Sequence, residues 1–254
     1  ILDEDVDYMV GIGNACLGGA LESEASGTVA IGTSALAALT SGDGNLAIGY
    51  QALTANTTGS SNVAIGYAAM STANSGSFTH NIAIGKNALN STSTNGSSGN
   101  IAIGTDALTD QTTGTANVAI GYLAMANTVA GQGNVAIGYN AMETAAHADA
   151  DYNTAVGYQA GVLITEGAGN ALFGAAAGDS ITTGDFNVCI GESAGKTMQT
   201  ANGIVCIGRD AMSSAAQTTD ANYTVGVGYG SLQNLTSGIS NVAVGAYALD
   251  AEDV

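Results

Sequence analysis

Residues 62–66 read Asn-Val-Ala-Ile-Gly, and close variants of this pentapeptide recur from one end of the 254-residue chain to the other. Successive copies end on glycines that are 17 residues apart in eight cases, 19 in four and 20 in one. A period of this length is typical of a solenoid, in which each repeat forms one rung that packs against its neighbours. The fourteen rung-ending glycines are Gly13, Gly32, Gly49, Gly66, Gly85, Gly104, Gly121, Gly138, Gly157, Gly174, Gly191, Gly208, Gly228 and Gly245.

Large and small residues alternate within each pentapeptide. The residue before the glycine is Ile, Val or Phe, the residue two places earlier is mostly Val, Ile or Leu, and Ala, Gly or Cys usually lies between them. This period of two predicts a β-strand. A 17-residue rung is too short to include a covering helix, but at about 3.3 Å per residue it suffices for two short strands and two corners. We therefore predict an all-β, parallel β-solenoid of about fourteen rungs of 17–20 residues, with residues 1–254 as a single repeat domain.

Both faces of the predicted strand are apolar, one lined by Val and Ile and the other by Ala and Gly. One face can be buried inside the coil, and the other needs a partner chain because an extended apolar face is not left in water. We assign the small-residue face to the interface of a homotrimer. The expected interface residues are Ala30, Ala47, Ala64, Ala83, Ala102, Ala119, Ala136 and Ala155.

A second signature follows the glycine, as in Tyr-Gln-Ala-Leu at residues 50–53. It supplies the other wall of the coil, either as a short strand or as a helical turn. Within residues 153–203 the signature changes to Ala-Gly, and an apolar residue appears three places later, at Ile164, Ile181 and Met198. We expect the apolar anchor of these variant rungs to have moved along the rung.

Composition and charge exclude several classes of function. The chain has 37 Gly, no Pro, no Trp and only 5% aromatic residues, yet 46% are hydrophobic, which indicates a thin, regular interior. Three basic residues against 21 acidic ones give a net charge of -18. So few cations cannot neutralise a run of phosphates, and we expect no binding to nucleic acid or to anionic lipid. The acid excess instead keeps an apolar fibre soluble.

The chain contains no run of 18 apolar residues, so we expect no membrane insertion. It begins at Ile1 without a signal-peptide pattern, and we expect it to be part of a longer protein.

Residues that could carry chemistry are few. Cys189 and Cys206 are 17 residues apart in the small-residue column, so we expect neighbouring, buried, free thiols whose side chains point the same way. His80 and His147 are four rungs apart, which argues against a histidine-based metal site or a Ser-His-Asp triad. The acidic clusters near residues 3–7, 149–151 and 250–253 match no calcium loop. We expect no catalysis and no cofactor, with Ca²⁺ as the alternative at the acidic clusters.

The pattern Asn-Val-Ala-Ile-Gly-Tyr-x-Ala, as at residues 134–141, resembles the head repeats of YadA-like trimeric autotransporter adhesins and related repeats in bacteriophage tail fibres. The resemblance covers essentially the whole chain. It implies a left-handed parallel β-roll, three chains around one axis and attachment to host surfaces. The rungs are longer than the adhesin head repeat, and no coiled-coil stalk or membrane anchor accompanies them, which favours the phage-fibre branch.

We therefore predict a non-enzymatic extracellular or virion-surface fibre, either a trimeric tail-fibre shaft or a surface-attachment protein. The alternative is a purely structural, self-assembling extracellular filament. The longer rungs add their extra residues at one corner, where aromatic and polar side chains suit stacking on a host glycan or a protein receptor. Free drift of loop length is the competing explanation of these insertions. The candidate binding ridge is Phe78, His80, His147, Asp149, Asp151, Tyr152, Asp220 and Tyr223.

Overall fold

A computed structural model of the protein describes residues 8–21, 25–72, 78–90, 97–144, 150–214 and 221–250. The chain forms two compact units, Ile1–Ala130 and Gly131–Val254, and each is described by itself. Unit 1 contains β1 (Val10–Ile12), β2 (Val29–Ile31), β3 (Leu46–Ile48), β4 (Val63–Ile65), β5 (Ile82–Ile84), β6 (Ile101–Ile103) and β7 (Val118–Ile120). Unit 2 contains β8 (Val135–Ile137), β9 (Thr154–Val156), β10 (Ala171–Phe173), β11 (Val188–Ile190), β12 (Val205–Ile207), β13 (Val225–Val227) and β14 (Val242–Val244).

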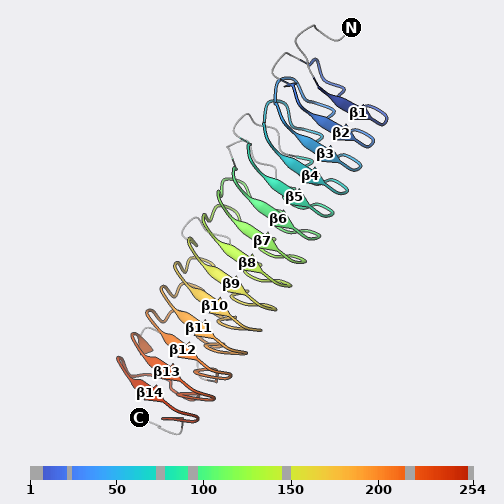
Figure 1. Ribbon diagram of the computed structural model, residues 1–254. Coiled ribbons are helices and arrows are strands. Elements are labelled where there is room, and N and C mark those ends of the chain that lie inside the picture. The colour runs from blue at the N-terminus through green and yellow to red at the C-terminus, as the bar shows by residue number, and fades with distance from the viewer. Residues whose placement is uncertain are drawn as a thin grey trace. The chain divides into compact units, whose positions relative to one another are not determined.

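Within each unit the strands pair in parallel and in chain order, so the arrow of one rung lies beside the arrow of the next (Figure 1). The register aligns equivalent repeat positions: Val63 pairs with Ile82, and Ala64 pairs with Ala83. The same alignment survives the change in rung length, because the extra residues lie outside the strands. The predicted parallel β-solenoid is confirmed, while the hand of the coil stays a prediction.

The small-residue column lies inside the coil, which corrects the predicted orientation of the strand. Ala47 is completely buried, whereas Leu46 and Ile48 on either side of it are only partly buried. The alanines assigned to a subunit interface have no exposed surface in a single chain, so they cannot contact a partner. These residues are Ala30, Ala47, Ala64, Ala83, Ala102, Ala119, Ala136 and Ala155.

The reason for this orientation is the opposite wall of the coil. Long side chains from the turn after the glycine fill the interior and leave room for only Ala, Gly or Cys on the facing strand. At the Gly226 position, for example, an added Cβ would lie 3.3 Å from Cδ1 of Leu232. The fully buried side chains of this wall include Leu36, Leu53, Met70, Leu89, Leu108, Met125, Met142 and Met212.

This second wall is a run of turns, and neither of the two expected alternatives describes it. Gln51 and Leu53 both have positive φ angles, 57° and 51°. The backbone still bonds from rung to rung, because the N–H of Leu53 donates to the carbonyl of Ala69 at 3.0 Å. Two laddered walls therefore enclose each rung.

The rung-ending glycine is required by the close approach of successive rungs. Gly66 has a φ of 140°, and a Cβ there would collide with the carbonyl group of Gly85. The strand can pass into the turn wall at this point only without a side chain. This explains why every rung places glycine at the end of the pentapeptide.

In the variant rungs, smaller residues in the turn wall are compensated by larger buried side chains nearby. Gly161 and Gly178 stand where other rungs have Leu or Met, and Ile164 and Ile181 are buried in their place. The opened space takes Leu172, the one large residue of the small-residue column: its Cδ1 lies 2.8 Å from where a Cβ of Gly161 would be. The interior is therefore filled cooperatively across neighbouring rungs.

Candidate functional site

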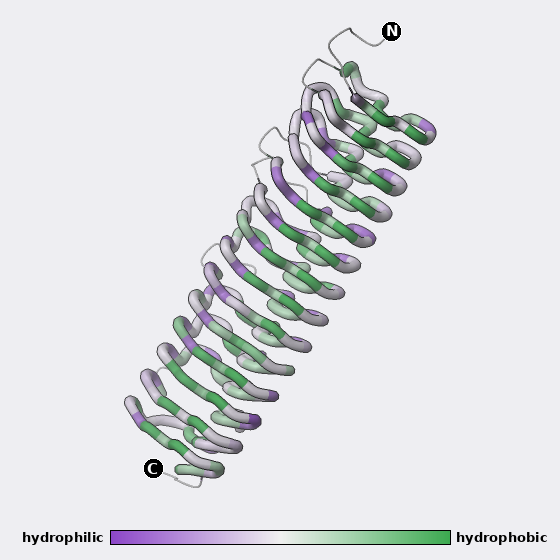
Figure 2. Tube along the Cα trace, viewed as in Figure 1, coloured by the Kyte–Doolittle hydropathy of each residue, from purple (hydrophilic) through white to green (hydrophobic). Residues whose placement is uncertain are grey.

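The outward face of the strands is the first candidate surface. On β4, Val63 and Ile65 flank the buried Ala64 and remain partly exposed, and the pattern repeats on the neighbouring strands. Figure 2 shows the strands as a largely green, hydrophobic band in each unit. We call these two columns the sheet-face strip. In unit 1 the strip consists of Val10, Ile12, Val29, Ile31, Leu46, Ile48, Val63, Ile65, Ile82, Ile84, Ile101, Ile103, Val118 and Ile120.

Unit 2 has a strip of the same design on its own strands. Ile137 is 37%, Phe173 41% and Ile190 40% exposed. A contiguous apolar surface of this kind is typical of an interaction site, because a soluble protein rarely leaves one open to water. The strip is regular and lined mainly by aliphatic side chains, so it suits a surface of the same kind.

The second candidate surface is a corner of the coil. The residue directly before the first position of each pentapeptide has a left-handed backbone conformation, and we call these residues the corner column. Three residues of the predicted ridge belong to it and are exposed, namely His80, Tyr152 and Tyr223. Asp151 lies beside Tyr152 and accepts hydrogen bonds from the backbone N–H and the side-chain amide of Gln132.

The structure corrects one predicted ridge residue and adds another. Phe78 is completely buried, so it belongs to the core and not to a binding surface. Phe186 is 70% exposed in the corner column, and sequence analysis missed it because its rung is not lengthened. Its position in the repeat could have revealed it, because Phe186 directly precedes Asn187 just as Tyr152 directly precedes Asn153. His147, Asp149 and Asp220 lie outside the described residues.

A third group of aromatic residues follows the rung-ending glycines. Tyr50 and Tyr67 stack with ring centroids 5.2 Å apart and an interplanar angle of 14°, and Tyr139 and Tyr158 stack at 5.2 Å and 9°. Each pair covers one ring face of both partners. That face of each tyrosine is therefore closed to other contacts.

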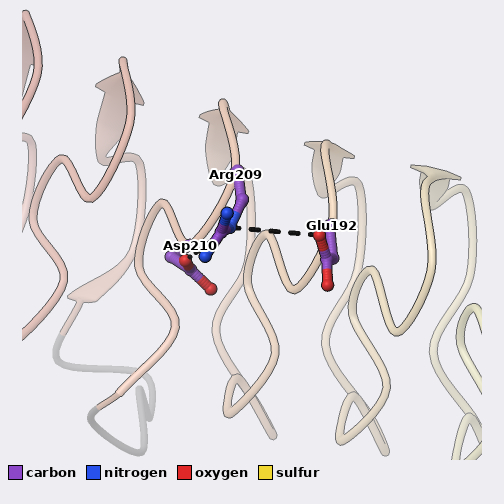
Figure 3. Close-up of polar contacts among 3 residues, drawn as sticks. All are labelled: Glu192, Arg209 and Asp210. Carbon is purple, nitrogen blue, oxygen red and sulfur yellow. Dashed lines mark hydrogen bonds and ion pairs between the residues drawn. The ribbon is translucent and has the colours of Figure 1, made fainter.

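The chain's single arginine occupies the same column in unit 2. Figure 3 shows Arg209 between Glu192 and Asp210, with Nε–carboxylate distances of 3.9 and 3.1 Å. Its guanidinium also lies 5.4 Å from the ring centroid of Tyr229. The arginine side chain is 59% exposed, and exposed ion pairs contribute little to stability. This cluster links successive rungs and has the features of an ordinary surface network.

The cysteines are free, and Cys189 lies directly opposite Cys206 in the register of β11 and β12. Both are buried, as expected from their column. A hydrogen bond to Cys189 and burial together raise the pKa of Cys206 well above its ordinary value. A thiol held protonated and covered is a poor nucleophile, so this pair fills space in the core.

The described residues offer neither a metal site nor a membrane-spanning helix. In that part of the chain, no cluster of three or more His, Cys, Asp or Glu side chains could hold a metal ion. The same residues contain no helix with the length and apolarity needed to cross a bilayer.

Comparison with known proteins adds no assignment: no protein-family model, no curated protein and no solved structure matches this chain.

Proposed function

We propose that this chain is the non-enzymatic shaft of an extracellular or virion-surface attachment fibre, assembled from three copies along their sheet-face strips. The observation that carries the proposal is the strip itself: two aliphatic columns remain partly exposed on strand after strand. Assembly through this face replaces the interface first expected at the buried alanines.

The energetics favour a long, repetitive contact. Burying a whole aliphatic side chain contributes about 1.5 to 3 kcal/mol, so covering the exposed part of a strip residue adds roughly 0.5 kcal/mol. One such contact cannot offset the entropic cost of association, which is about 4 to 15 kcal/mol. Contacts that are repeated along a whole strip can offset this cost. A solenoid that associates in register along its stack therefore gains affinity with each added rung.

Three copies provide a closed arrangement for such narrow strips. Each copy can turn its strip toward a common axis that runs along the stack, and a cyclic trimer leaves no strip unpaired. The turn walls and corners then face outward, where they are available to a receptor. A structural role alone, as a filament without a receptor, is the alternative that cell-binding measurements would support if the assembled protein bound no surface.

Sedimentation velocity of the purified chain tests the assembly. We expect a trimer at micromolar concentration, and we expect Ile84→Glu on the strip to shift the protein to monomer. Thr58→Glu is the matched control, because Thr58 is exposed on a loop of the same unit and the change adds the same charge. A soluble, stable monomer of the unmodified chain, or equal behaviour of the two variants, would refute the proposed interface.

A further inference from the structure

Glycine and aromatic residues alternate along the corner column of unit 2. The aromatic members are highly exposed: Tyr152 is 65%, Phe186 70% and Tyr223 67% exposed. Each follows a rung whose corner residue is glycine. From the β8 rung to the β13 rung the column reads Gly133, Tyr152, Gly169, Phe186, Gly203 and Tyr223.

Each ring is seated on the glycine of the preceding rung. A Cβ built on Gly169 would lie 2.7 Å from Cδ1 and 2.9 Å from Cε1 of Phe186. The corresponding distance to Cδ1 is 2.8 Å both for Gly133 with Tyr152 and for Gly203 with Tyr223. The missing side chain thus makes room for the ring against the backbone, and most of the ring surface stays in water. We call the three exposed rings of Tyr152, Phe186 and Tyr223 the platforms.

The fold itself does not require these aromatic residues. In unit 1 the same column contains Ser61, Gly99 and Ala116, with the same left-handed conformation. That conformation costs an L-residue about 1 to 2 kcal/mol, and it is uncommon for a bulky side chain. Non-glycine corner residues of both units accept this cost, so the strain belongs to the fold, but unit 2 places a large apolar ring at three of these positions and exposes it. Exposed apolar rings that the fold does not require indicate a binding role.

The spacing of the platforms fits a linear ligand. The rings recur every second rung, about 9.6 Å apart along the stack at the usual strand spacing. In an extended β-1,4-linked polysaccharide, every second sugar ring presents the same face, so the disaccharide repeat can place one pyranose on each platform. Exposed rings suit the apolar C–H face of a pyranose.

Hydrogen-bond acceptors flank the platforms and are held by the rungs. Oδ1 of Asp185, next to Phe186, accepts from the N–H of Ala168 at 2.8 Å, and Oδ1 of Asp151 accepts from the N–H of Gln132 at 2.8 Å. A carboxylate has further lone pairs that can accept from sugar hydroxyls. The carboxylates would also repel an anionic glycan, which matches the net charge of -18.

We infer that the corner column of unit 2 binds a neutral, linear β-1,4-linked polysaccharide, with every second sugar stacked on one of the platforms Tyr152, Phe186 and Tyr223. This inference rests on the proposed attachment function and names its ligand class. The stacked tyrosine pairs are a poorer platform, because one face of each ring is already covered by its stacking partner.

Isothermal titration calorimetry of the full chain with cellohexaose, chitohexaose and mannohexaose tests the inference. We expect at least one of them to bind, and its disaccharide to bind more weakly because it reaches fewer platforms. Tyr152→Ser, Phe186→Ser and Tyr223→Ser should each weaken binding about three- to tenfold, the range of one aromatic contact, and the triple variant should abolish it. Serine is compatible with the corner, since Ser61 occupies it in unit 1.

Two controls separate the site from general damage. His80→Ser changes the corner column of unit 1 and should leave binding unchanged. Gly169→Ala should weaken binding by displacing Phe186. Gly99→Ala adds the same backbone strain at a φ of 68° but makes only ordinary van der Waals contact, with the nearest atom 3.9 Å away, and should leave binding unchanged.

Several results would overturn the inference: no binding of any of the three hexasaccharides, unchanged binding by the triple variant, or binding only of polygalacturonate or of a proline-rich peptide. Light scattering on the same samples reports the oligomeric state. Lost glycan binding by an assembled protein is thereby distinguished from failed assembly.

Discussion

At the scale of the residue, a buried asparagine at the start of most pentapeptides connects the neighbouring rungs. The N–H of Asn62 donates to Oδ1 of Asn45 at 3.0 Å, and Oδ1 of Asn62 in turn accepts from the N–H of Asn81 at 3.0 Å. Its Nδ2 donates to the carbonyl of Phe78 at 2.8 Å. The ladder satisfies backbone groups at a corner that water does not reach. This explains why asparagine opens ten of the fourteen pentapeptides.

Asn62→Ala should therefore destabilise unit 1. It leaves the N–H of Asn81 and the carbonyl of Phe78 buried and unpaired, at about 1 to 3 kcal/mol for each group. Urea denaturation followed by circular dichroism measures the free energy of unfolding. Asn62→Thr is the control and should cost less, because Oγ1 of Thr28 already serves as acceptor for the N–H of Asn45 at 3.4 Å. Equal losses for the two variants would contradict a role in hydrogen bonding.

The raised pKa of Cys206 predicts a loss of stability at alkaline pH. The hydrogen bond to Cys189 and burial keep the folded thiol protonated above 9.0, the ordinary pKa, while the unfolded thiol ionises there. The contribution of the Cys206 thiol to the free energy of unfolding is therefore fully present below pH 9.0. It declines as pH rises from there toward the higher pKa of the folded state. Denaturation at about pH 8 and about pH 10 should show a smaller decline for Cys206→Ala than for the unmodified chain. An equal decline in stability for Cys206→Ala and the unmodified chain would show that other groups cause the loss at alkaline pH.

At the scale of the element, each strand has an inner and an outer face that differ in side-chain size. On β7, Ala119 is fully buried and its neighbour Ile120 is partly exposed. The inner face admits only small groups because the turn wall fills the coil from the other side. The outer face has no such limit, which permits Phe173 on β10.

This arrangement predicts opposite effects of one charge at adjacent positions. Ala119→Glu buries a carboxylate without a partner and should lower the free energy of unfolding by more than about 3 kcal/mol. Ile120→Glu should leave the fold intact and interfere with assembly instead. Thermal melting by circular dichroism and sedimentation velocity distinguish the two effects. A fully stable Ala119→Glu variant that merely fails to assemble would restore the small-residue face as an interface.

At the scale of the whole molecule, an acidic chain with an apolar strip predicts how assembly depends on salt. Copies with a net charge of -18 each repel one another, and salt screens that repulsion without weakening apolar contacts. Sedimentation equilibrium at about 0.01 M and about 1 M NaCl should therefore show tighter association at the higher concentration, where the Debye length falls from about 30 to about 3 Å. Dissociation at high salt would indicate that ionic contacts hold the copies together.

The sequence by itself determined the parallel β-solenoid, the position of every strand and the burial of both Cys189 and Cys206. The repeat period and the alternation of large and small residues specify these features, and a rung of 17 residues leaves no room for a covering helix. Only the tertiary structure decided which face of the strand is inside. Both faces are apolar, so the choice depends on how far Leu53 and its equivalents reach across the coil.

The same distinction applies to the candidate binding residues. Loop length located Tyr152 and Tyr223 at the corner, but it wrongly included Phe78 and omitted Phe186. An aromatic residue near a corner becomes a core residue or a platform according to its backbone conformation and the volume beside it. Phe186 is a platform because it has a φ of 56° at the corner and because Gly169 has no side chain to exclude its ring. Gly169 lies 17 positions away in sequence and is adjacent to Phe186 only in the folded stack.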